Sequence, residues 1–181
     1  MDMSKVVVIS GSPSGTSRLD GLLKHTTSYL EKSGAHTTLL RVRDLPAEDL
    51  LYARFDSDAI QQASAAVAEA DAVIVATPVY KASYTGILKA FIDLLPQKGF
   101  ENKIMLPLAM GGTLAHHLSI DYALKPLMSA LGATRILTGM FVLDSQVSWG
   151  GNGELEMQEE VSARHARTIE QLLSTVKPSI A

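Results

Sequence analysis

The chain has 181 residues, of which 46% are hydrophobic and 19% are charged, and we expect a single domain over residues 1–181. A formal net charge of −3 leaves no basic surface for a nucleic acid or a membrane, and no apolar segment is long enough for a signal sequence or a membrane span, so we expect a cytoplasmic protein. The lack of cysteine excludes disulfides, thiolate nucleophiles and thiolate metal sites, and any redox chemistry must therefore come from a cofactor.

The first predicted element is a strand at Lys5–Ser10, whose apolar run is typical of a strand buried on both faces. A loop of Gly, Ser and Thr follows it, and apolar residues at helical spacing from Leu19 to Leu30 then predict a helix. The backbone N–H groups of such a loop and the positive end of the helix dipole suit a phosphate. The loop lacks both G-x-x-x-x-G-K-[ST] and G-x-G-x-x-G, so neither an NTPase nor a dinucleotide fingerprint is present.

We predict a phosphate site in this first loop (Ser10–Arg18). Its hydroxyl groups can donate to phosphate oxygens, Gly11 and Gly15 leave the backbone accessible, and Arg18 is its only cation. The alternative is a Ser/Thr helix cap beside a solvated Arg18. The predicted phosphate ligands are Ser10, Ser12, Ser14, Thr16, Ser17 and Arg18.

The next segment continues the alternation of strands and helices. We predict that Gly34 ends the first helix and that His36–Val42 is the second strand. Asp44–Asp56 is too apolar for a disordered linker and is expected to form a short helical crossover. Ser57 is then the predicted cap of a helix that reaches about Ala70.

The stretch Ala72–Pro96 is the centre of the predicted fold. Its first five residues are small or β-branched and apolar, which indicates a third strand buried on both faces. Pro78 holds the preceding residue extended, and Ser83–Leu95 has apolar residues at helical spacing. Ligands of open parallel sheets bind outside the carboxyl ends of strands, so the second loop (Thr77–Lys81) is a predicted ligand site, with an ordinary strand-to-helix connection as the alternative.

The last third of the chain supplies two more strands. Lys103–Ala109 is the predicted fourth strand and leads into a third loop (Gly111–Thr113), where bare backbone can lie beside a flat ligand. A helix is expected at His117–Leu131, distorted before Pro126. The remaining predicted elements are a fifth strand at Thr134–Asp144, a flexible loop at Trp149–Gly153 and a final helix from about Glu156 to Val176.

This order of elements predicts an α/β fold with a doubly wound, five-stranded parallel sheet in the order 2-1-3-4-5. The three loops then meet at the switch point of the sheet. One loop suits a phosphate and the other two offer backbone amides and a wall of small residues, as FMN requires at its two ends, so we predict FMN as the source of redox chemistry. The residues predicted to line its ring are Pro78, Val79, Tyr80, Lys81, Gly111, Gly112, Thr113 and His116.

Five segments between about Val6 and Gln146 resemble the NADPH-dependent FMN reductases, in particular the branch that serves two-component alkanesulfonate monooxygenases. These segments are Gly11–Pro13, Leu51–Asp56, Thr77–Ala82, Gly111–His116 and Asp121–Pro126. The resemblance implies a flavodoxin-like fold, a homotetramer, hydride transfer from NADPH to FMN, and a flavin-dependent monooxygenase as partner. Members of the wider family often carry Arg at the position of Ser14, so the phosphate charge here would depend mainly on Arg18.

Other functions remain open at this point. A flavodoxin-like electron carrier would share the fold and the first loop, but mild acidity and the open Gly111–Gly112 turn favour a second substrate. An NAD(P)H quinone or azo reductase is the alternative enzyme, and the choice between NADPH and NADH stays open. A metal site is disfavoured because adjacent His116 and His117 point roughly 100° apart on a helix. A hydrolase built from Ser12, His116 and Asp144 is the weakest reading.

Two helices carry wide apolar faces, Gly86–Leu95 and His117–Leu131. These faces exceed what one side of a sheet requires, and we predict that they bury against other copies in a closed homotetramer. Tyr122 precedes Pro126 and is the predicted extra residue of a π-bulge at this interface.

Overall fold

The computed structural model describes residues 3–176, and its centre is a parallel sheet in the predicted order, β2-β1-β3-β4-β5, with β6 also paired to β4. The apolar runs of the central strands explain this arrangement, because strands without polar alternation are stable only between two layers of helices. The strands are β1 Lys5–Ser10, β2 His36–Arg41, β3 Ala72–Pro78, β4 Ile104–Gly111, β5 Arg135–Ile136 and β6 Met140–Leu143.

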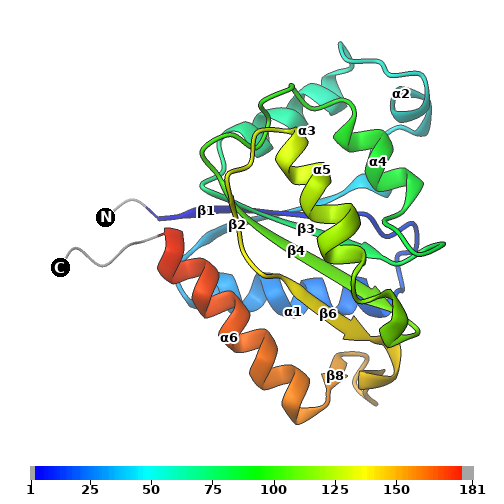
Figure 1. The fold of residues 1–181 in the computed structure, drawn as a ribbon, viewed down its shortest axis with the longest axis vertical. Coiled ribbons are helices and arrows are strands. Elements are labelled where there is room, and N and C mark those ends of the chain that lie inside the picture. The colour runs from blue at the N-terminus through cyan, green and yellow to red at the C-terminus, as the bar shows by residue number, and fades with distance from the viewer. Residues whose placement is uncertain (1–2, 177–181) are drawn as a thin grey trace.

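Helices cover both faces of the sheet (Figure 1). One layer contains α1 (Arg18–Lys32) and α6 (Glu159–Val176), and the opposite layer contains α3 (Asp58–Ala68), α4 (Gly86–Ile92) and α5 (Lys125–Ala130). Alternate residues of β1 face the two layers: Val6 and Val8 pack with the α1 and α6 side, and Val7 and Ile9 pack with the other. The sheet therefore separates two apolar cores. No helix among residues 3–176 combines the length and the apolar character that crossing a membrane requires.

The segment predicted as one fifth strand is divided into β5 and β6. β5 pairs with Ile104 and Met105, β6 pairs from Leu108 onward, and the break lies opposite Pro107 of β4. Proline has no N–H to donate to a neighbouring strand. Gly139, at φ +90°, passes so close to Pro107 that a Cβ there would lie 2.7 Å from the proline carbonyl oxygen. The prediction of one continuous strand was wrong because Pro107 interrupts the pairing.

The segment predicted as one helix at His117–Leu131 is also divided. A 3-10 turn η2 (Leu114–His116) is followed by the π-helix η3 (Ile120–Leu124), which contains Tyr122, and then by α5. Pro126 lies in the first turn of α5, where a missing N–H costs little. The expected distortion before Pro126 is confirmed, and it takes the form of a π-helical turn.

Trp149–Gly153 is the turn region of a small hairpin rather than a flexible loop. Val147–Trp149 (β7) pairs antiparallel with Leu155–Met157 (β8), and Gly150 N–H donates to Glu154 O at 2.8 Å. The Trp149 ring lies over Gly21 of α1, where a Cβ would come within 2.7 Å of the indole. The hairpin occupies the predicted start of the last helix, so α6 begins at Glu159.

The second strand and its crossover lie close to their predicted positions. A 3-10 turn η1 (Val42–Asp44) and the short helix α2 (Ala47–Leu51) form the crossover. Ser57 precedes α3 as predicted, but its hydroxyl donates to the Asp49 carboxylate and does not cap the helix. The side-chain capping role of Ser57 was therefore a wrong prediction, because a charged acceptor lies within its reach.

A buried polar contact joins α1 to α6. Thr26 Oγ1 donates to Leu22 O at 2.9 Å, and it lies 2.8 Å from His165 Nε2. Because the hydroxyl has only one proton, Nε2 must be the protonated ring nitrogen and Nδ1 must be the bare one. His165 is 1% exposed, and Nδ1 has no hydrogen-bond partner.

Candidate functional site

The first loop leaves the carboxyl end of β1 and is held by its own hydroxyl groups. The Ser12 and Ser17 hydroxyls lie 2.8 Å apart, and Ser12 Oγ also donates to Ser14 O at 3.1 Å. Ser17 caps α1 by accepting from Asp20 N–H at 3.1 Å. The helix-cap alternative is thus correct for Ser17, while the capped helix still points its dipole at the loop.

The predicted phosphate ligands fall into two groups. Ser10 and Ser12 are buried, and Ser12 N–H lies 3.4 Å from Ser10 Oγ. Ser14, Thr16 and Arg18 are exposed at the rim of the loop. The structure therefore places hydroxyl groups and one guanidinium at the surface, above a floor of buried serines.

The second loop makes a tight reversal after β3. Val79 N–H donates to Met110 O at 2.8 Å, and Tyr80 N–H donates to Ser83 O at 2.9 Å. Lys81 and Ala82 have φ values of 51° and 65°, the left-handed backbone of a tight turn. Two of the three amides that this loop was predicted to offer to a ring edge are thus already bonded. Of these three, Lys81 N–H is the one that has no partner among the described residues.

Gly11 and Thr85 connect the first two loops. Gly11 N–H donates to Ala76 O at 2.8 Å, and its carbonyl accepts from Thr85 Oγ1 at 2.7 Å. Thr85 is also the cap of α4, where it accepts from Leu88 N–H. A Cβ on Gly11 would lie 2.7 Å from Leu88 Cβ. Gly11 therefore serves the close packing of the loops rather than direct access to a ligand.

The third loop continues β4 and supplies a bare surface. Gly111 is buried, and a Cβ there would lie 3.2 Å from the Phe141 ring and 3.4 Å from Val79. Gly112 is exposed, and a Cβ there would meet only Asp144 Oδ2, at 3.7 Å. Thr113 accepts from Ala115 N–H at the start of η2. The third loop therefore exposes bare backbone at Gly112, whereas side chains cover its surface from Thr113 onward.

One cation beside the first loop could not be predicted from the spacing. Arg43 belongs to η1, about 25 residues further along the chain than Arg18. Its guanidinium carbon and both terminal nitrogens lie 3.2 Å from the place that a Gly15 Cβ would occupy. The β1–β2 pairing, with Ser10 opposite Arg41, brings the two segments together. Arg18 is therefore not the only cation at this loop.

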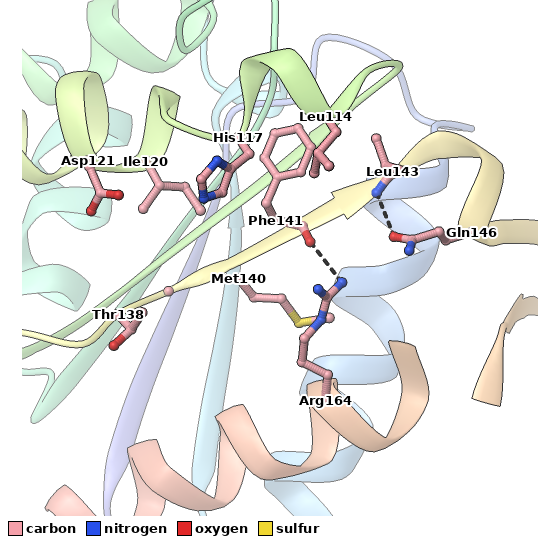
Figure 2. A pocket seen from close by; sticks show the side chains of 11 residues that line it. Leu114, His117, Ile120, Asp121, Thr138, Met140, Phe141, Leu143, Gln146 and Arg164 are labelled. Carbon is pink, nitrogen blue, oxygen red and sulfur yellow. Dashed lines mark hydrogen bonds between the residues drawn. The ribbon is translucent and has the colours of Figure 1, made fainter. Parts of the chain in front are cut away.

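A separate cavity of about 220 Å³ lies between η3, β6 and α6, next to the third loop (Figure 2). Leu114 and His117 border it on the side of the third loop, and the His117 ring meets Phe141 edge-on at 6.4 Å. Figure 2 shows Arg164 reaching from α6 to donate to Phe141 O at 2.9 Å. The sequence carried no signal for this cavity, because its walls come from three elements far apart in the chain.

The residues present fit a phosphorylated flavin. The first loop combines exposed hydroxyls, a helix N-terminus and the buried Nη1 of Arg43, which has no partner. The second loop supplies the free Lys81 N–H, and the third loop supplies bare backbone at Gly112. The sheet order defines an α/β protein of the flavodoxin-like class, and the three loops at its switch point are the candidate flavin site.

Comparison with known proteins agrees with this class and narrows it. The sequence matches the NADPH-dependent FMN reductase family over residues 4–148, and the chain belongs to that family. It is 52% identical over 144 residues to FMN reductase (NADPH) of Pseudomonas putida, covering 80% of this chain and 73% of the relative. The apo structure of the NADH:FMN oxidoreductase EmoB superposes with a TM-score of 0.87 at 34% identity, covering 98% of this chain and 92% of the other. An archaeal flavodoxin shares the fold alone, with a TM-score of 0.66 at 14% identity, covering 96% of this chain and 99% of the other.

The predicted identity as an NAD(P)H-dependent FMN oxidoreductase is therefore confirmed at the level of the family. FMN and NADPH are its flavin and nicotinamide. The individual site residues in the three loops stay predictions, to which the structure adds Arg43 as a neighbour.

Proposed function

We propose that this reductase takes FMN as a dissociable substrate and hands the reduced flavin to a flavin-dependent monooxygenase of the alkanesulfonate type. The observation that carries the proposal is the openness of the site. Tyr80 at the tip of the second loop is 53% exposed, and Leu114 after the third loop is 66% exposed. A site with such open walls is suited to a flavin that enters and leaves in each cycle.

We propose that the side chains of this protein bind and orient the flavin and take no chemical part in the hydride transfer. The first loop holds the phosphate with hydroxyls, the helix dipole and arginine charge, while Lys81 N–H and the Gly112 backbone border the ring. A bound flavin supplies the redox chemistry by accepting a hydride from NADPH. Direct hydride transfer needs close stacking and no protein acid or base, so the side chains contribute by binding and orientation.

The test is steady-state NADPH oxidation by purified protein with FMN varied from none to saturation. We expect a rate that depends on added FMN, and product that supports turnover of an alkanesulfonate monooxygenase in a coupled assay. A rate independent of added FMN, with flavin that stays bound through gel filtration, would contradict release. A quinone that outcompetes FMN as acceptor would assign the quinone reductase function instead.

The proposed assembly is a homotetramer with Tyr122 at an interface. Tyr122 is 79% exposed and Leu118, whose carbonyl accepts from Tyr122 N–H at 2.9 Å, is 49% exposed. Large exposed side chains on the π-helical turn and just before it favour a protein contact. Light scattering at micromolar concentration should give a mass near four chains, and Tyr122→Ala should shift it toward smaller species. A monomeric wild-type mass would refute the assembly.

A further inference from the structure

Arg43 is an arginine whose charge the protein itself leaves largely uncompensated. Its Nε donates to Asp44 Oδ1 at 3.3 Å, but the Asp44 side chain is 62% exposed. Its Nη1 is buried and has no hydrogen-bond partner. Since a guanidinium does not lose its proton, this buried N–H group cannot become neutral and requires an acceptor.

The neighbouring Arg41 shows what a compensated arginine looks like in the same place. Arg41 comes from the end of β2, and its Nε donates to Asp20 Oδ1 at 3.0 Å. The Asp20 side chain is only 3% exposed, so this ion pair is shielded from solvent. Two residues further on, Arg43 turns its guanidinium against Gly15 and has no comparable carboxylate. Of these two neighbouring arginines, Arg43 is therefore the one with unused binding capacity.

The position of the guanidinium indicates the kind of acceptor. The guanidinium carbon and both Nη atoms of Arg43 lie 3.2 Å from the place that a Cβ on Gly15 would occupy. The guanidinium plane therefore covers the first loop at Gly15. A side chain at position 15 would displace the plane. The first loop is the predicted phosphate loop, and a phosphate dianion offers the oxygen acceptors and the opposite charge that Nη1 lacks.

We propose that Arg43 is a half-buried cation of the flavin phosphate site and that it sets the preference of this enzyme for FMN over riboflavin, the same flavin without phosphate. The inference rests on the proposed binding of FMN at the first loop. Arg43 acts on the phosphate and on the loop that carries it, and it does not contact the ring. Its loss therefore weakens the binding of FMN and leaves that of riboflavin nearly unchanged.

A purely structural role for Arg43 makes a different prediction. If the guanidinium only supported the backbone at Gly15, removing it would disturb the first loop for any flavin. FMN and riboflavin would then lose affinity by the same factor. The ratio of the two affinities separates the two roles, and neither affinity does so alone.

The experiment measures the dissociation constants of FMN and riboflavin by flavin fluorescence for wild type, Arg43→Gln and Arg43→Lys. Arg135→Gln is the matched control, because Arg135 is exposed on β5, which pairs with the start of β4 and not with its carboxyl end. For Arg43→Gln we expect FMN binding to weaken about tenfold to a hundredfold, with riboflavin changed less than about twofold. Arg43→Lys should show a smaller loss, also confined to FMN, and Arg135→Gln should show none.

Equal loss for both flavins, or no loss for either, would overturn the role of Arg43 in phosphate binding. If Arg43→Gln fails to fold by circular dichroism, the FMN-to-riboflavin ratio of Arg43→Lys decides by the same criterion. Failure of the proposed function has a separate signature. NADPH oxidation that does not depend on added flavin would contradict the proposal that FMN is released after each cycle. The ratio of the FMN and riboflavin affinities would still test the role of Arg43.

Discussion

Two of the three buried side-chain nitrogens that lack a hydrogen-bond partner within residues 3–176 belong to residues beside α1. Arg43 Nη1 lies beside the first loop, where α1 begins, and the His165 ring, whose Nδ1 has no partner, contacts Thr26 in the middle of α1 through Nε2. Both atoms are buried, yet their chemistry differs. A guanidinium keeps its charge, whereas an imidazole can release its proton and leave a bare lone pair.

The difference decides what each unpartnered atom means. At His165, burial and then the nearby His25 lower the pKa from 6.5 to about 4, so the ring is neutral near pH 7 and needs no counter-charge. The Arg43 guanidinium cannot become neutral in this way, so the missing partner of its Nη1 indicates a ligand. An unpartnered buried nitrogen is therefore evidence for a binding site only when its group cannot become neutral.

The largest effect we predict is on stability in acid. The unfolded chain takes up the His165 proton as the pH falls through 6.5, but the folded chain does so only at about 4. The free energy of unfolding should therefore fall across this window, with His165 contributing a loss of about 3 kcal/mol. His165→Leu should remove most of this dependence, because it removes the imidazole that takes up the proton. Thr26 would still donate its hydrogen bond to Leu22 O. Urea denaturation at several pH values between 7 and 4 measures it.

His36→Gln is the control for that experiment. His36 is exposed at the start of β2, so its replacement should leave the acid dependence as it is in wild type. If the free energy of unfolding of wild type stays constant between pH 7 and 4, His165 takes up its proton in the folded state as readily as in the unfolded state. His165 would then not differ from Arg43 in the way proposed.

A smaller effect is expected at Gly15. An added Cβ would lie 3.2 Å from three guanidinium atoms of Arg43, which is tight enough to move the flexible end of that side chain. Gly15→Ala should therefore weaken FMN binding about fivefold, roughly 1 kcal/mol, with riboflavin unchanged. Fluorescence titration with both flavins checks this. Gly86→Ala is a matched control, because no heavy atom lies within 4 Å of a Cβ there. Loss of riboflavin affinity in Gly15→Ala would mean that the backbone itself has been displaced.

Much of the fold could be predicted because it follows from local patterns. The apolar runs of β1 and β3 indicate strands buried on both faces, and the alternation with helices gives the order of the sheet. The division of the fifth strand could not be predicted in the same way. It depends on Pro107, which lies in another strand and meets Gly139 only after the sheet has formed.

The candidate site shows the same limit. The three loops could be placed at one end of the sheet, because the carboxyl ends of parallel strands share an edge. Which amides remain available could not be predicted, since Val79 and Tyr80 donate to Met110 and Ser83. Arg43 was missed because nothing in its own neighbourhood marks it, and only the β1–β2 register brings it to Gly15.

The smallest effect we predict is for Arg18, which the sequence presents as the only cation of the first loop. Arg18 is exposed at the first position of α1, so water screens its charge, and the half-buried Arg43 is proposed to share its task. Arg18→Ala should weaken FMN binding only about two- to threefold, roughly 0.5 kcal/mol, and raising the salt concentration should erase most of that loss. More of the loss caused by Arg43→Gln should persist in salt, because a partly buried pair is screened less than an exposed one. Titrations of both variants at low and high salt measure the contrast. If Arg18→Ala weakens FMN binding more than Arg43→Gln at high salt, Arg18 binds the phosphate and Arg43 supports the loop.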